Sequence, residues 1–170
     1  MLGCEWRYDM IQAEDLQEGI ELCRQNVDRL LEDASILYES GSYGHAQALA
    51  ILAMEEYAKK IVLVAQKTHP RRFDEKIGRA FGDHDFKLQL ALDMLIKEFP
   101  GAPSGEEVAR IVMDTARKLS SLKQVSLYVD YDSNLGWFDP NKADYKNIAA
   151  VQIVYTKELV QRVDSWLERI

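Results

Sequence analysis

Cysteine and positive charge are both scarce in this chain of 170 residues, and each scarcity excludes a class of protein. Cys4 and Cys23 are too few and too oddly spaced for a disulfide framework or a zinc site, so we expect a reducing compartment. Twenty-one bases stand against 28 acids, and the net charge is −7. That balance argues against a protein that coats nucleic acid through its overall charge, although it leaves room for a local basic patch.

Long hydrophobic runs are missing as well. No apolar run approaches the ~20 residues that a membrane span requires. The N-terminal residues include acids and lack the apolar core of a signal peptide. We therefore expect a cytoplasmic protein that does not associate with a membrane.

Motifs that bind cofactors are also missing. The sequence has no glycine-rich phosphate loop and no His-Glu-x-x-His motif, and it lacks the Glu-x-x-His pairs of di-iron bundles. We expect no metal and no other cofactor.

Apolar residues recur at helical spacing along most of the chain. Hydrophobic residues make up 47% of the sequence and charged residues 29%, which is typical of one globular domain over residues 1–170, with an irregular lead-in at 1–13. The spacing predicts an all-α, up-and-down bundle of about five helices without a sheet. The predicted helices span about residues 15–40, 43–67, 84–98, 105–127 and 142–170.

The segments between these helices have distinct compositions. Gly41 and Ser42 fit a C′ glycine followed by an N-cap serine, which predicts a tight antiparallel hairpin of helices. Residues 67–79 form a predicted loop rich in bases, and Asp83 is the predicted N-cap of the next helix. Residues 128–140 are aromatic and acidic and lack helical periodicity, so we expect an ordered loop there.

The second predicted helix combines an almost wholly apolar sequence with four charges, Glu55, Glu56, Lys59 and Lys60. One interpretation is two surface ion pairs, Glu55 with Lys59 and Glu56 with Lys60, each one turn apart. The other places Glu55 or Glu56 inside the bundle, paired with a cation from another helix, because a buried charge needs a partner. Adjacent helical positions point about 100° apart, so the two glutamates should differ in role.

A second charged group opens the third predicted helix. His84 and Lys87 lie one turn apart there, and Arg79 precedes His84 in an Arg-x4-His spacing. The positive end of a helix dipole favours the neutral imidazole ring, which is the form that acts as a base. A histidine that only caps the helix or faces solvent is the structural alternative.

Several segments together resemble a known family. The segment from Leu30 to Lys60 reads LLEDASILYESGSYGHAQALAILAMEEYAKK and resembles the first helical hairpin of HEPN domains. The Glu-Glu-x-x-Lys motif that ends at Lys59, followed by His-x-x-Lys from His84, is similar to the AbiV-type branch, the abortive-infection proteins. Lys-Gln-x-Ser-Leu-Tyr-Val-Asp, which begins at Lys123, is similar to the segment before that branch's last helix.

The resemblance covers about residues 26–145 and implies a helical-bundle protein of bacterial or archaeal phage defence, of a kind that often acts as a homodimer. Many HEPN proteins are metal-independent ribonucleases, so it implies that Arg79 stabilises phosphate charge and that His84 acts as general acid or base on RNA. The supporting charged cluster would be Glu55, Glu56, Lys59 and Lys87, and the RNA-binding bases Lys67, Arg71, Arg72 and Lys76.

Two alternatives to the ribonuclease stay open. One is a non-catalytic module that binds a phage or antitoxin protein through the aromatic segment, with Tyr128 and Trp137 in contact with the partner. The other is a bundle in which the charged cluster has a purely structural role.

Overall fold

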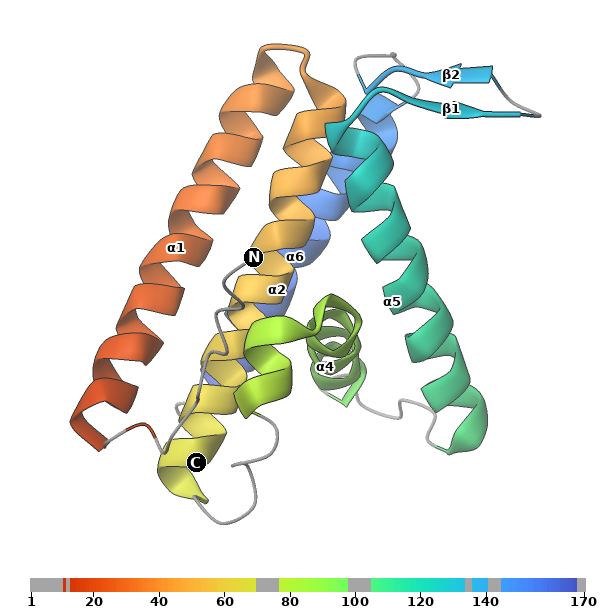
Figure 1. The fold of residues 1–170 in the computed structure, drawn as a ribbon. Helices are drawn as coiled ribbons and strands as arrows, with labels where there is room; N and C mark the ends of the chain where they lie inside the picture. Colours follow the sequence, from red (N-terminus) through yellow and green to blue (C-terminus); the bar gives the residue numbers. More distant parts are fainter. Residues whose placement is uncertain are drawn as a thin grey trace, which may run out of the picture.

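The structure is a computed structural model that describes residues 11, 13–69, 77–97, 105–133, 136–140 and 145–167. Five long helices dominate these residues, and the predicted all-α bundle is confirmed (Figure 1). They are α1 (Ala13–Glu39), α2 (Tyr43–Thr68), α4 (His84–Lys97), α5 (Glu106–Leu127) and α6 (Tyr145–Leu167). No helix in these described ranges is long and apolar enough to cross a membrane.

Helix α2 is the centre of the bundle. It packs against α1, α4, α5 and α6, and 16 of its 26 residues are buried. Figure 1 shows it between α1 and α5, with α6 behind it. Its small and medium side chains allow close helix packing on several sides, which is typical of a central helix. The main core cluster includes side chains from all five helices, among them Val27, Met54, Leu88, Ala116 and Leu159.

Helix α5, in contrast to α2, buries few of its residues. Four of its 22 residues are buried, namely Val112, Ala116, Lys123 and Ser126. These positions lie on one face of the helix, and the side chains at its other positions are partly or largely exposed. Helix α5 therefore closes one side of the bundle with a single narrow seam.

The turn between α1 and α2 forms as its glycine predicts. Gly41 adopts a φ of 84°, a left-handed conformation that glycine reaches without the steric cost of a Cβ. Ser42 is the N-cap residue of α2, but its hydroxyl makes no capping hydrogen bond. It contacts His45 Nδ1 at 2.9 Å instead.

The predicted basic loop over residues 67–79 is wrong at both of its ends. Helix α2 continues to Thr68, and residues 77–82 are helical. The cause is apolar packing, because Ile77 and Ala80 are three positions apart and both are buried in a cluster with Val62. Residues 70–76 lie outside the described part of the chain.

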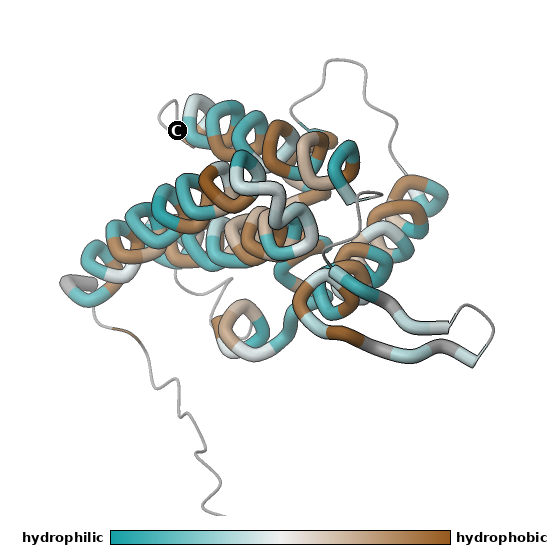
Figure 2. The backbone as a smooth tube through the Cα atoms, turned by 90° about the horizontal axis from the view of Figure 1, so that it is seen from above, coloured by the Kyte–Doolittle hydropathy of each residue, from teal (hydrophilic) through white to brown (hydrophobic). Residues whose placement is uncertain are grey.

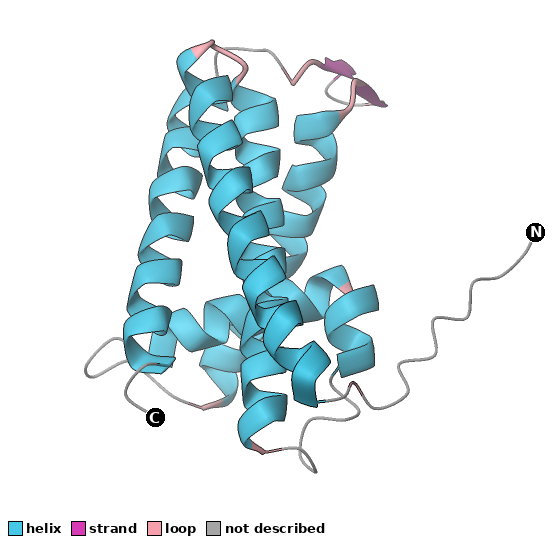
Figure 3. Ribbon diagram, turned by 90° about the vertical axis from the view of Figure 1, so that its left-hand side faces the viewer, coloured by secondary structure: helices cyan, strands magenta, loops and turns pink. Residues whose placement is uncertain are grey.

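The described residues of the aromatic segment, 128–133 and 136–140, are ordered, as predicted, but they form a small β-hairpin where a loop was predicted. Strands β1 (Asp130–Asp132) and β2 (Gly136–Phe138) pair antiparallel, with Tyr131 opposite Trp137. The hairpin extends beyond the helices when the bundle is viewed from above (Figure 2), and it lies at the same end as the α1–α2 turn (Figure 3).

One close contact attaches the end of this segment to α2. The backbone N–H of Gly44 donates a hydrogen bond of 3.1 Å to the carbonyl oxygen of Pro140. A Cβ atom on Gly44 would lie 2.2 Å from that oxygen, so only glycine permits this approach.

Candidate functional site

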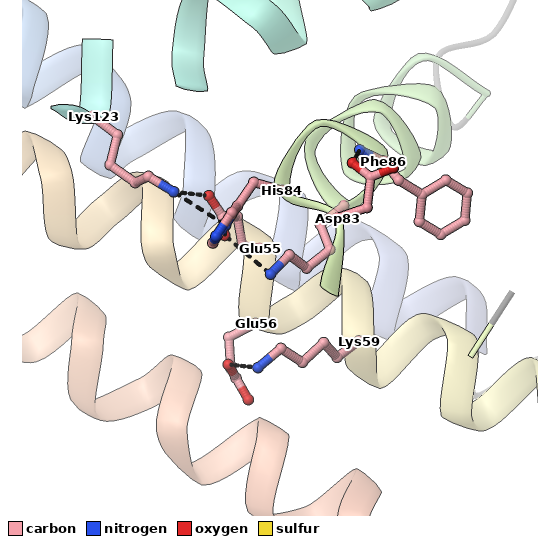
Figure 4. A network of polar contacts seen from close by, with 8 residues as sticks. Glu55, Glu56, Lys59, Asp83, His84, Phe86 and Lys123 are labelled. Carbon is pink, nitrogen blue, oxygen red and sulfur yellow. Dashed lines mark hydrogen bonds and ion pairs between the residues drawn. The ribbon is translucent and has the colours of Figure 1, made fainter. Parts of the chain in front are cut away.

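The carboxylate of Glu55 is the centre of a buried charged cluster (Figure 4). Glu55 is 2% exposed and lies on the face of α2 that packs against α4 and α5. Its Oε2 atom is 2.5 Å from His84 Nδ1 and 3.2 Å from Lys87 Nζ, and both partners are on α4. Its Oε1 atom accepts a hydrogen bond from Lys123 Nζ on α5. One side chain from α2 therefore joins three helices.

His84 is positioned by the start of α4. Asp83 caps this helix, since its Oδ1 atom accepts a 2.9 Å hydrogen bond from the backbone N–H of Phe86. The N-cap predicted at Asp83 is confirmed. The cap leaves the His84 side chain on the first turn, where it reaches Glu55 and stays 55% exposed. The cluster therefore opens to solvent at the histidine ring.

The state of Glu55 determines which nitrogen of His84 carries a proton. Burial alone would raise the pKa of Glu55, but hydrogen bonds from Lys123 and His84 outweigh burial, and the pKa is lowered. The ionised carboxylate can only accept, so His84 Nδ1 must carry the hydrogen that it donates. This assignment leaves Nε2 with its lone pair in the neutral ring, as a general base requires.

The other charges of α2 have different partners. Glu56 pairs with Lys59 at 2.7 Å on the side of α2 that faces α1 (Figure 4). Lys60 Nζ lies 2.6 Å from Oδ1 of Asp164 on α6, and the same oxygen accepts a 2.6 Å hydrogen bond from the hydroxyl of Tyr57. The predicted surface pairs, Glu55 with Lys59 and Glu56 with Lys60, are therefore wrong. The alternative, a buried Glu55 paired with cations from other helices, is correct.

Arg79 lies apart from this cluster. Its guanidinium is 3.3 Å from Asp83 Oδ2 and stacks over the Phe86 ring at 4.3 Å. The side chain is largely exposed, so it is available to a ligand or to a second molecule. The roles predicted for Arg79 and His84 remain predictions, and in a single chain these two side chains have separate partners.

The predicted RNA-binding bases are only partly described. Lys67 is exposed at the end of α2 and donates a 2.7 Å hydrogen bond to Gln17. Arg71, Arg72 and Lys76 lie outside the described residues.

Of the predicted partner-contact residues, Trp137 lies in β2 and Tyr128 is the C-cap residue of α5, just before β1. Tyr128 and Trp137 are both exposed, with 67% of Trp137 open to solvent. The Trp137 ring packs against Tyr131 with 5.2 Å between ring centroids.

Lys123 is the site residue that sequence reasoning missed. A signal for it was present, because Lys123 continues the apolar seam of α5 at alternating spacings of four and three: Val112, Ala116, Leu119, Lys123 and Ser126. A lysine inside such a seam is buried at this position, and burial of an ammonium group requires a charged or hydrogen-bonding partner. Glu55 is that partner.

The family model HEPN_AbiV, described as AbiV, matches residues 15–161 of the chain. No curated protein and no solved structure matched. The matched region contains every residue of the Glu55 cluster.

Proposed function

This chain belongs to the AbiV family of HEPN proteins, and on that premise we propose that it is an abortive-infection protein that cleaves RNA with His84 as the acid–base residue. The observation that supports this is the 2.5 Å contact between Glu55 and His84 Nδ1, on a ring that is half exposed. A buried carboxylate that holds one ring nitrogen leaves the other oriented toward solvent for proton transfer.

The proposed reaction is an internal transesterification of RNA. His84 Nε2 removes the proton from a ribose 2′-hydroxyl, whose oxygen then bonds to the adjacent phosphorus as the bond from phosphorus to the 5′-oxygen breaks. The leaving 5′-oxygen takes a proton from an imidazolium ring. The products are a 2′,3′-cyclic phosphate and a 5′-hydroxyl, so neither an oxidant nor a water molecule is consumed.

A homodimer would supply the second ring. His84 of one copy then acts as the base while His84 of the other acts as the acid. Arg79 is exposed next to the helix that His84 begins, and in a dimer its guanidinium would contact RNA phosphate.

RNA cleavage in EDTA tests the proposal. We expect the wild type to cleave and the His84→Ala variant to lose roughly 10²–10⁴-fold in rate, the usual contribution of general acid–base catalysis. His69→Ala is the matched control, because His69 is also exposed and lies outside the cluster. Equal rates for wild type and His84→Ala, or no cleavage by either, would refute the ribonuclease.

A second candidate function rests on the hairpin. The hairpin extends beyond the helices (Figure 2) and carries the aromatic pair Tyr131 and Trp137, both of which are exposed. Large exposed aromatic side chains are typical of protein contact sites. In this function the chain binds a phage or antitoxin protein through the hairpin. Trp137→Ala should then abolish co-purification of that protein, whereas His84→Ala and the exposed α6 control Val151→Ala should retain it. The reverse pattern would count against the hairpin as the contact site.

A further inference from the structure

The Glu55 cluster contains more positive than negative charge. The side chains of Lys87 and Lys123 are 4% and 3% exposed, so both ammonium groups are as buried as the carboxylate they share. In the described part of the chain, the ion pairs of these two lysines run to Glu55 alone. The formal charges of Lys87, Lys123 and Glu55 leave one unbalanced positive charge.

Two neighbouring acids, Asp83 and Glu56, have other partners. Asp83 is paired with Arg79, and its other carboxylate oxygen caps α4. Glu56 is paired with Lys59 on the side of α2 that faces α1. An unbalanced charge in a buried site is unfavourable unless a counterion is bound.

We infer that Lys87, Lys123 and His84 form a binding site for one singly charged tetrahedral anion, the phosphodiester group of RNA. Each ammonium has three N–H donors, and Glu55 occupies one donor of each, so donors remain for an anion. A phosphodiester has one negative charge and balances the cluster, whereas a terminal phosphate, with nearly two charges, exceeds it. This inference rests on the proposed ribonuclease and identifies the part of the substrate that the cluster binds.

Lys123 has a specific place in this site. Its Nζ atom lies 3.3 Å from Nδ1 of the half-exposed His84 ring, so its charge lies next to the proton-transfer group. Negative charge increases on the phosphate oxygens as the 2′-oxygen attacks, and a fixed cation beside them stabilises that state. Lys123 thus adds a second fixed cation to the phosphate charge stabilisation proposed for Arg79.

Binding of a 2′-O-methyl RNA oligonucleotide tests the site separately from cleavage, because this RNA has no free 2′-hydroxyl to react. We expect Lys123→Met and Lys87→Met each to weaken binding about tenfold or more, the effect of losing one hydrogen bond to a charged group. Lys123→Arg should bind within a few-fold of the wild type. Lys60→Met is the matched control, because Lys60 is also a buried lysine but is paired with Asp164 outside the site.

Removal of the Glu55 carboxylate, which competes with the RNA phosphate for the two lysines, should strengthen binding rather than weaken it. Glu55→Gln increases the excess charge by one, so it should tighten binding of the same oligonucleotide while it slows cleavage of ordinary RNA. A variant that loses affinity only because it is misfolded would also lose its helical circular dichroism and its cooperative melting.

If the methionine variants do not fold, the anion site can still be tested on the wild-type protein. Dimethyl phosphate, a singly charged diester, should shift the NMR signals of the His84 ring and leave those of His69 unchanged, and acetate at equal ionic strength should shift them less. Unchanged RNA binding in folded Lys87→Met and Lys123→Met, or no dimethyl phosphate shift at His84, would overturn the site.

These outcomes separate the site from the catalytic proposal. Lysine-dependent binding without any RNA cleavage would refute the ribonuclease and support the anion site. Cleavage at the wild-type rate by both methionine variants would support the ribonuclease and refute the site.

Discussion

His84 Nδ1 lies 2.5 Å from Glu55 Oε2, although 29 positions separate the two residues in the sequence. This contact joins the first turn of α4 to the middle of α2, and Lys123 brings α5 to the same carboxylate. The cluster is therefore a structural connection between three helices as well as the candidate site. Structural and functional roles of Glu55 must be separated by experiment.

Replacement of Glu55 by Gln should destabilise the fold strongly. The substitution leaves two buried ammonium groups without their carboxylate, and breaking a buried ion pair in this way costs about 3–5 kcal/mol in the free energy of unfolding. Urea denaturation followed by circular dichroism measures this change.

Glu56→Gln is the matched control for that measurement. Its pair with Lys59 is partly exposed, so its loss should cost no more than about 1 kcal/mol. Equal destabilisation by the two substitutions would show that the buried Glu55 cluster contributes no more to stability than the Glu56–Lys59 pair.

Stability should decrease in acid because of Glu55. Its pKa in the folded state is below the ordinary value of 4.5 that applies to the unfolded chain. The unfolded state therefore binds a proton first, and the stabilisation from Glu55, complete above about pH 4.5, is lost as the pH falls through the lower folded pKa. Urea midpoints between about pH 3 and pH 7 should show a smaller pH dependence for Glu55→Gln than for the wild type. Parallel curves for the two proteins would contradict this role.

Gly44→Ala should loosen the attachment of the segment after the hairpin. The new Cβ would lie 2.2 Å from the Pro140 carbonyl oxygen, so the backbone must shift, at a cost of about 1–3 kcal/mol in stability. Hydrogen exchange should accelerate at the Gly44 N–H, which donates to Pro140. Gly82→Ala is the control, because nothing lies within 4 Å of the added Cβ and residue 82 is helical, so this change should be neutral or slightly stabilising.

Cys23 should be chemically inert in the folded protein. Burial, with Glu56 nearby, raises the pKa of its thiol to about 12, so almost no thiolate is present at neutral pH. In a Cys4→Ser background, iodoacetamide should label Cys23 only after denaturation, as measured by intact mass. Rapid labelling of the native protein at pH 7 would show that α1 opens readily from α2.

Prediction from sequence succeeded where the signal is local. The first predicted helix, at about residues 15–40, and the turn at Gly41 depend on residues within a few positions of each other, and the structure has the helix and the turn at these places. It was less successful where distant residues determine the outcome. The helical segment at residues 77–82 depends on the packing of Ile77 and Ala80 against Val62, a contact that no local pattern shows.

The sequence by itself determined that this protein is an all-α bundle of the AbiV type, with a central helix that carries charges which need partners. Tertiary structure alone decided which partners they have. Glu55 and Glu56 are adjacent in the chain and alike in chemistry, but about 100° of helical rotation directs Glu55 to His84, Lys87 and Lys123 and Glu56 to Lys59 on the side of α1. The candidate site exists because three helices meet at one of those two faces.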